Sequence, residues 1–403
     1  MKWPTAKLAE CCTKIGSGST PRGGDSVYQD EGIALIRSQN IYNGLFTTDG
    51  LAFIGDEHAD ELAGVTVEQG DVLLNITGDS VARCCQVPES ALPARVNQHV
   101  AIVRPKPEQF DARYLLYFLI SPPMQSYMLS RAGTGGTRNA LTKEMIQHFE
   151  IPKPPLDEQR RIAEVLTAYD ELMENNRRRM ALLEEAARQL YAEWFVRLRY
   201  PGHARTRRAD TLPKGWTRRP LGEVADVNRE TLGSSFQGEL EYVDISAVTP
   251  GRIAETTRYD FADAPSRARR VVRHGDIIWS CVRPNRRSHA VIWNPEPNLI
   301  VSTGFAVLTP KTLPTSYLYE ATTTDAFVRN LENRARGAAY PAVVARDFEE
   351  SEIRVPPAPL VSAFNDFAEP LLAQLKTLTF QTQKLRTARD LLLPRLMSGE
   401  IAV

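Results

Sequence analysis

The chain has 403 residues, which is too long for one ordinary core and suits two domains with connecting segments. Hydrophobic residues make up 42% and charged residues 24%, which excludes a disordered chain, and the longest strongly apolar run, residues 114–120, is far shorter than the roughly 20 residues of a membrane span. The net charge is zero, so the chain lacks the overall basic excess of a protein that binds nucleic acid through charge alone. We therefore expect a cytoplasmic protein with no membrane partner.

Two copies of one pattern of predicted elements follow each other along the chain. Each copy begins at a tryptophan, Trp3 or Trp216, and continues with a Gly-Asp turn, a buried strand and a second apolar strand that runs into a proline. A helical segment, a loop rich in glycine or alanine, and a proline-rich hinge complete each copy. The corresponding segments are residues 70–75 and 275–280, 100–105 and 305–310, 114–118 and 317–327, 133–138 and 336–340, and 151–156 and 353–360. Because one order of elements occurs twice, the sequence predicts a tandem duplication.

After each hinge the spacing of the apolar residues changes from that of strands to that of a long helix. Apolar residues then recur every three or four positions, with one irregular step at Asn176 in the first helix. Each apolar seam is too narrow for a globular core, so we expect the two helices to pack on each other; the alternative is that each helix docks only on its own domain. The expected seam residues are Ile162, Val165, Tyr169, Leu172, Asn176, Leu183, Leu190, Leu371, Leu375, Leu378, Leu385 and Leu392.

These patterns predict the fold class α+β, with two tandem sheet-containing domains, each followed by a long helix, and the two helices packing as an antiparallel coiled coil. The expected boundaries are a first domain at residues 1–152, a first spacer helix at 153–200, a basic linker at 201–215, a second domain at 216–356, and a second spacer helix with the C-terminal tail at 357–403.

Sequence motifs for catalysis and for metal binding are absent. The glycine-rich segment 133–138 lacks the Lys and the hydroxyl residue of a phosphate-binding loop, and is more typical of a tight turn. No lysine has an acidic residue two positions earlier, an arrangement that nucleases often use, and the five cysteines and six histidines do not fall at metal-ligand spacing. We therefore expect a non-catalytic chain that holds no metal and no cofactor.

Charge is distributed unevenly along the chain. Residues 1–110 hold 9 basic and 14 acidic residues, whereas residues 201–289 hold 16 basic and 11 acidic residues. Arginine provides 39 of the 49 basic residues, and its planar guanidinium suits contacts with phosphate and guanine. A GC-rich genome would produce the same arginine bias, so both explanations stay open.

Several stretches of the chain closely resemble the specificity subunit of type I restriction–modification systems. The most specific are the hinge and helix start IPKPPLDEQRRIAEVL from Ile151, the segment YAEWFV from Tyr191, and the terminal segment LLPRLMSGEI from Leu392. Asn175–Arg177, Gly18–Pro21 and the strand that begins at Gly70 are similar as well, whereas the Gln expected after the second hinge leucine is absent. The resemblance covers essentially the whole chain.

This resemblance implies two target-recognition domains, each of which reads one half of a bipartite site on double-stranded DNA, spaced by antiparallel helices. It also implies that the subunit has no active site and recruits two adenine-methylating modification subunits, often with two restriction subunits. S-adenosylmethionine and ATP would then be cofactors of those partner subunits.

Polar side chains on the loops between predicted strands are the candidates for DNA contacts, because arginine reads guanine and asparagine reads adenine. A cluster of donors at residues 283–288 directly follows a predicted strand and is the strongest candidate; for any single residue the alternative is a solvated surface side chain. The candidates are Arg37, Ser38, Asn40, Thr77, Arg83, Arg138 and Asn139 in the first domain, and Arg269, Arg270, Arg283, Asn285, Arg286, Arg287 and Tyr340 in the second.

Two other functions remain open from the sequence. The chain could be the recognition part of a restriction–methylation enzyme, or a coiled-coil adaptor that does not bind DNA. Substitution of Arg283 and Arg286 separates these functions: a DNA-specificity subunit would lose recognition of one half-site, whereas a coiled-coil adaptor would not.

Overall fold

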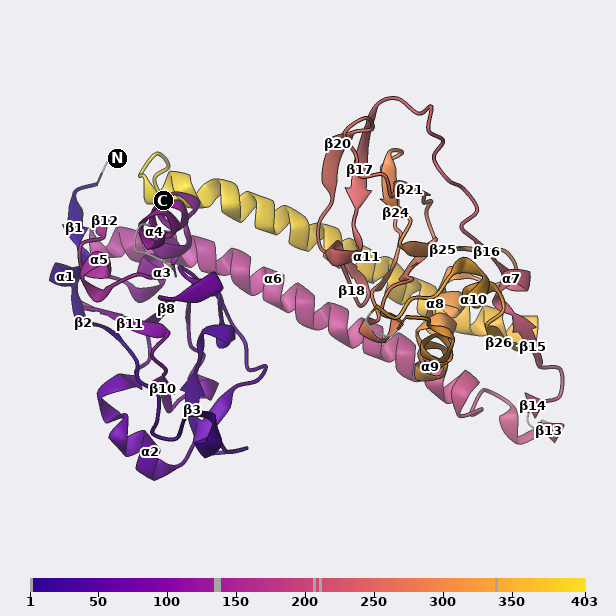
Figure 1. Cartoon of the computed structure of the whole chain (residues 1–403), viewed down its shortest axis with the longest axis horizontal. Coiled ribbons are helices and arrows are strands. Elements are labelled where there is room, and N and C mark those ends of the chain that lie inside the picture. The colour runs from indigo at the N-terminus through magenta and orange to yellow at the C-terminus, as the bar shows by residue number, and fades with distance from the viewer. Residues whose placement is uncertain (1–2, 134–138, 206–207, 210–211, 338–339) are drawn as a thin grey trace. The chain divides into compact units, whose positions relative to one another are not determined.

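The computed structural model describes residues 3–133, 139–205, 208–209, 212–337 and 340–403. The chain divides into two units: the first comprises residues 1–175 and 381–403, and the second comprises residues 176–380. Two long helices, α6 (Leu156–Tyr191) and α11 (Ala358–Met397), each contribute one segment to each unit. Every unit therefore contains its own sheet elements and a segment of both long helices (Figure 1).

The first unit contains two four-stranded sheets, with the strand orders β2-β11-β8-β9 and β6-β3-β10-β7. Strands β3 and β10 pair in parallel, and the other neighbouring strands pair antiparallel. Strand β1 pairs with β12 at the hinge. The bounds are β1 (Thr5–Lys7), β2 (Cys12–Ser17), β3 (Ile33–Ile36), β6 (Ala52–Ile54), β7 (Thr66–Val67), β8 (Val72–Asn75), β9 (Cys84–Gln86), β10 (Ala94–Val96), β11 (Val100–Pro105) and β12 (Glu150–Pro152).

Strand β8 shows why the central strands have continuous apolar sequences. Successive side chains of a strand point to opposite faces of its sheet. Val72 and Leu74 pack into the core formed with the helices, while Leu73 between them packs into the core shared with the other sheet. Because both faces of the strand are buried, β8 lacks the alternation of apolar and solvent-exposed polar side chains that a strand with one exposed face would have.

The second unit repeats this arrangement strand for strand. Its sheets have the orders β16-β25-β22-β23 and β20-β17-β24-β21, the parallel pair is β17 with β24, and β15 pairs with β26 at the hinge. The predicted duplication and the predicted fold class are thus confirmed. The bounds are β15 (Thr217–Pro220), β16 (Ala225–Val227), β17 (Glu239–Val243), β20 (Thr257–Asp260), β21 (Ala268–Val271), β22 (Ile277–Ser280), β23 (His289–Val291), β24 (Leu299–Ser302), β25 (Phe305–Pro310) and β26 (Glu352–Val355).

Three helices connect the sheets of each unit to its hinge: α3 (Ala112–Ile120), α4 (Pro122–Ala132) and α5 (Lys143–Gln147) in the first, and α8 (Thr315–Thr323), α9 (Asp325–Arg334) and α10 (Ala345–Glu349) in the second. The third residue of α3 and of α8 is a completely buried tyrosine, Tyr114 and Tyr317. The hydroxyl of Tyr114 donates to the carbonyl oxygen of Pro152 at 3.1 Å, and the hydroxyl of Tyr317 donates to the backbone carbonyl oxygen of Arg354 at 2.7 Å. Each sheet domain is thereby joined to the hinge that leads into its long helix.

The two long helices run antiparallel within each unit, as expected. In the first unit Ile162 and Leu166 of α6 share one core with Leu393 and Leu396 of α11. In the second unit Tyr191 and Phe195 near the end of α6 pack on Phe364 near the start of α11, with ring centroids 5.8 Å and 5.2 Å apart. Helix α6 ends at Tyr191 and continues as a π-helical turn, Ala192–Val196.

The observed seam of α6 differs from the expected one at Leu172. Leu172 is 50% exposed, whereas Met173 beside it is buried. Buried positions recur every seven residues at Leu166, Met173, Met180 and Ala187, so the seam has no irregular step. Leu172 and Met173 are adjacent and both apolar. The spacing of apolar residues therefore could not tell which of them is buried, and the prediction of Leu172 was wrong.

Across the described residues, no helix combines the length and the apolar character that a membrane crossing would need.

Tyr117 of α3, Asp170 of α6 and Arg389 of α11 form one hydrogen-bonded group in the first unit. The Tyr117 hydroxyl donates to one carboxylate oxygen of Asp170 at 2.6 Å, and Nη1 of Arg389 donates to the other oxygen at 2.6 Å. The group joins the sheet domain to segments of both long helices.

We expect the substitution Asp170→Asn to lower the free energy of unfolding of the first unit by about 1–2 kcal/mol, because it weakens two charge-assisted hydrogen bonds. Urea unfolding followed by circular dichroism measures the loss. The matched control is Asp157→Asn, whose carboxylate pairs with Arg160 on an exposed helix face and should contribute less than about 0.5 kcal/mol. Equal losses in the two variants would contradict the proposed role of Asp170.

Candidate nucleic-acid interface

An arginine-containing loop follows the central buried strand in both sheet domains. It lies between β8 and β9 in the first domain and between β22 and β23 in the second, and each loop includes a short 3-10 turn, Gly78–Ser80 or Pro284–Arg286. Each loop also forms one β-bridge to the segment that follows α4 or α9, between Thr77 and Ala140 or between Val282 and Ala342. The duplication thus places two different loops at the same position of the fold.

The loop of the second domain has a fixed backbone. Arg283 and Arg287 at its two ends adopt the left-handed conformation, with φ of 50° and 53°, which costs free energy in residues other than glycine. The amide of Arg283 donates to the carbonyl oxygen of Pro341 at 2.7 Å, and Pro284 is buried beneath the turn. The side chains of Asn285 and Arg286 between them are exposed to solvent.

Aromatic rings support two of the arginines in the second domain. The guanidinium carbon of Arg283 lies 4.3 Å from the ring centroid of Tyr340, which is 66% exposed, and that of Arg269 lies 4.5 Å from the centroid of Phe261. A ring beneath a guanidinium stabilises the cation while its donors can point outward. Arg270 donates instead to the hydroxyl of Thr231 at 2.9 Å.

Arg287 differs from the other arginines of this loop. Its guanidinium forms an ion pair with Asp325 at the start of α9 and thereby joins the loop to that helix. His289 directly after the loop is buried, and burial lowers its pKa to about 4, with a further decrease from the charge of Arg287. This histidine is therefore neutral at neutral pH and adds no charge to the loop.

The first domain brings two predicted segments together. The side-chain amide of Asn75, at the end of β8, donates to the carbonyl oxygen of Ser38 at 2.9 Å, so the Arg37–Asn40 turn lies beside the β8–β9 loop. Arg37 and Arg83 lie over tyrosine rings, at 5.2 Å from the centroid of Tyr28 and 5.0 Å from that of Tyr42. The hydroxyl of Thr77 is 2.7 Å from Nδ1 of His99.

The predicted residue Asn40 is not available for base contacts. It is completely buried, its side-chain oxygen accepts from the amide of Arg37, and its side-chain nitrogen donates to the carbonyl oxygens of Thr47 and Asp49. Its amide therefore holds the turn, and we leave Asn40 out of the interface. Asn139 is exposed, and Arg138 lies outside the described residues.

The sequence interpretation missed the aromatic partners Tyr28, Tyr42 and Phe261. Each ring is separated by between 8 and 41 positions from the arginine that lies over it, and no motif marks the pairs. The paired arginines thus depend on contacts that only the fold creates.

Among the described residues, no group of three or more His, Cys, Asp or Glu side chains is arranged to hold a metal ion.

Comparison with known proteins shows that the chain is similar to DNA specificity subunits. Residues 1–185 match the family described as type I restriction modification DNA specificity domain. Over the whole chain, the sequence is 23% identical to the type I restriction enzyme MjaIX specificity subunit of Methanocaldococcus jannaschii and covers 94% of that protein. It is also 23% identical to the MjaVIII specificity subunit of the same organism, over 47% of the chain and 44% of that protein.

The fold is similar to that of a solved S subunit of a type I restriction–modification system from M. genitalium. The TM-score is 0.61 at 16% identity, and the match covers 98% of this chain and 96% of the other.

We expect Arg287→Ala to loosen the loop of the second domain, because its ion pair with Asp325 is a contact between the loop and α9. An ion pair this exposed contributes about 0.5–1 kcal/mol, so amide exchange in residues 283–288 should become about two- to fivefold faster by mass-detected hydrogen exchange. The control Arg286→Ala removes an exposed side chain of the same loop and should leave exchange unchanged. Equal exchange rates in wild type and Arg287→Ala would show that the ion pair does not hold the loop.

Proposed function

We propose that the chain is a specificity subunit of a type I restriction–modification system and that its two recognition domains each read one part of a bipartite, asymmetric DNA site, because it is similar to such subunits along its whole length. The chain is the non-catalytic DNA-specificity component of such a system. Methylation and cleavage accordingly belong to other subunits.

The observation that carries the proposal is the difference between two loops at one position of a duplicated fold. The β22–β23 loop carries Arg283, Arg286 and Arg287, whereas the β8–β9 loop carries Arg83 and the acidic Asp79. Arginine donors suit the acceptors of guanine, while hydroxyl and amide groups suit other base edges. Two domains with one fold and different loops would therefore bind two different sequences.

We propose that the DNA interface consists of the loop side chains that remain accessible and the arginines stacked on aromatic rings. Asn285 and Arg286 would contact base edges, and the ring-supported arginines would contact bases or phosphates. The members are Arg37, Ser38, Thr77, Arg83 and Asn139 in the first domain, and Arg269, Arg270, Arg283, Asn285, Arg286 and Tyr340 in the second, with Arg287 as a residue that positions its loop. Arg138, which lies outside the described residues, is included from the sequence alone.

The partners proposed are two modification subunits that methylate adenine with S-adenosylmethionine, and two ATP-dependent restriction subunits where the system includes them. The acidic balance of residues 1–110 supports such an assembly, since a domain with 14 acidic and 9 basic residues attracts DNA weakly by itself. Basic surfaces of the modification subunits would then provide many of the phosphate contacts.

The test is to express the chain with its modification subunit and to map adenine methylation across a genome by single-molecule sequencing. Each bidentate base contact contributes about 1–3 kcal/mol, so the double substitution Arg283→Ala with Arg286→Ala should lower methylation of the native site at least tenfold. The base preference of one half-site should relax, and assembly with the modification subunit, measured by mass photometry, should persist.

The matched control is the double substitution Arg218→Ala with Arg219→Ala, which removes two exposed arginines from β15 beside the hinge. This control should keep the native methylation pattern. An unchanged pattern in the loop variant would refute the interface of the second domain, and the absence of any methylated motif in the wild-type complex would refute the proposed function.

A further inference from the structure

Helices α3 and α8 occupy the same place in the two units and have nine residues each, so their positions can be compared one by one. The third residue of both is the tyrosine that binds the hinge. The sixth residue is Tyr117 in the first unit and Glu320 in the second. The same buried position therefore holds a phenol in the first unit and a carboxylic acid in the second.

The position is fully partnered in the first unit. The Tyr117 hydroxyl binds Asp170, which also pairs with Arg389, so its polar atom has a hydrogen-bonding group and the aspartate has a counter-ion. Burial raises the pKa of Tyr117, and the phenol remains neutral.

The carboxyl group of Glu320 has no hydrogen bond or ion pair to any described residue, and the residue is buried, with 6% of its surface exposed. Burial raises the pKa of Glu320 to about 8, the charge of Arg188 opposes this, and nearby Glu184 adds to it. Isolated buried carboxylates are costly, and those that persist in proteins usually have a partner.

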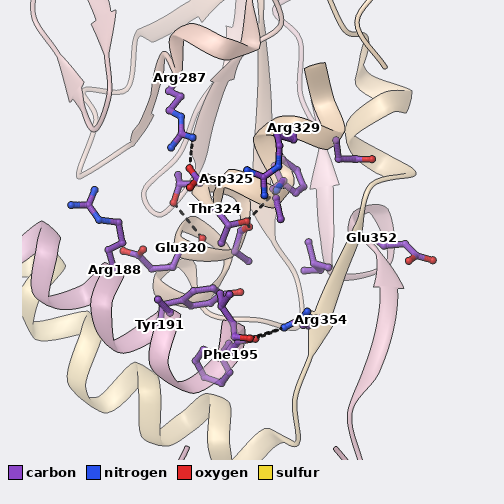
Figure 2. A pocket seen from close by; sticks show the side chains of 18 residues that line it. Arg188, Tyr191, Phe195, Arg287, Glu320, Thr324, Asp325, Arg329, Glu352 and Arg354 are labelled. Carbon is purple, nitrogen blue, oxygen red and sulfur yellow. Dashed lines mark hydrogen bonds and ion pairs between the residues drawn. The ribbon is translucent and has the colours of Figure 1, made fainter. Parts of the chain in front are cut away.

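Glu320 lines a cavity of about 460 Å³, within the size range of small-ligand sites. Figure 2 shows Glu320 beside Arg188 and above Tyr191, with Glu352 at the opposite edge. Smaller residues accompany the change at position six: Ala321 and Thr323 of α8 replace Phe118 and Ile120 of α3. The second unit therefore has an open space where the first has large apolar side chains.

The charges around this cavity favour a cationic occupant at its inner end. Four arginines line it, but three already have partners: Arg188 pairs with Glu185, Arg287 pairs with Asp325, and Arg354 donates to the carbonyl oxygen of Phe195 at 2.8 Å. Arg329 is exposed at the rim.

Glu320 on this side of the cavity interacts electrostatically with Glu184 on α6. A cation bound beside Glu320 would lower its raised pKa and so stabilise the ionised carboxylate. Tyr191, Phe195 and Phe327 form the apolar part of the wall, which suits the stem of an organic cation. A metal ion does not fit, because the described residues provide no group of three ligands here.

We propose that this cavity of the second unit is a binding site for an organic cation, a guanidinium or ammonium group on an apolar stem, with Glu320 as its counter-ion. The cation would supply the partner that Glu320 lacks, and the aromatic wall would hold the stem. Such a group is found on a free polyamine and on an arginine or lysine side chain of a protein. Arg287 of the β22–β23 loop lines one edge of the cavity, but its guanidinium pairs with Asp325, so the site uses none of the side chains that contact DNA in the proposed function and does not depend on that function.

Two probes, titrated into the full chain by isothermal calorimetry, test the site. N-acetyl-L-argininamide presents a guanidinium as a polypeptide does, and spermidine presents free ammonium groups. We expect at least one probe to bind with a millimolar or tighter Kd, to raise the Tm of the wild-type chain, and to lose at least tenfold in affinity in Glu320→Gln. The probe that binds more tightly identifies the source of the cation.

The matched control is Glu352→Gln, which removes a carboxylate from the far edge of the same cavity and should change affinity less than twofold. Without a probe at neutral pH, Glu320→Gln should melt at a higher temperature than wild type, because the raised pKa of Glu320 means that folding must protonate its carboxyl group, whereas the amide is always neutral. Failure of both probes to bind the wild-type chain would overturn the proposal, and so would equal binding by wild type and Glu320→Gln. The wild-type titration decides the matter even if the Gln variant does not fold.

Discussion

Each long helix has to bury one apolar face against two surfaces within a unit, its own sheet domain and the other long helix. At the start of α6, Ile162 and Leu166 lie in one core with Tyr114 and with Leu393 of α11. At the start of α11, Phe364 packs in the same way on Tyr317 and on Tyr191 of α6. Burial of this kind supplies most of the stability of an amphipathic helix, so neither helix is explained by its own sequence alone.

This shared burial also explains why some parts of the two copies differ more than other parts. The tyrosine that binds the hinge is the same in both copies, because its hydroxyl and its ring are both buried. The exposed side chains of the β8–β9 and β22–β23 loops differ freely, because no core contact constrains them. Position six of α3 and α8 lies between these extremes, since it is buried but faces a space that the two units fill differently.

Much of the fold could be predicted from the sequence, because the order of its elements depends on local patterns. Gly-Asp turns, apolar strands, proline-rich hinges and helical spacing are all visible along the chain, and they occur twice. The choice between Leu172 and Met173 could not be predicted, because only the partner helix decides which of two adjacent apolar residues is buried. The pairing of Arg37 with Tyr28 and the burial of Asn40 likewise depend on contacts between strands.

The first unit is assembled from both ends of the chain, residues 1–175 together with 381–403. Leu393 and Leu396 complete the core formed with Tyr114 and Leu166, yet they follow the whole second unit along the chain. The core of the first unit is therefore completed only after the second unit has been synthesised. Removal of Leu393 and Leu396 would damage the core of the first unit, although the second unit lies nearer to them in sequence.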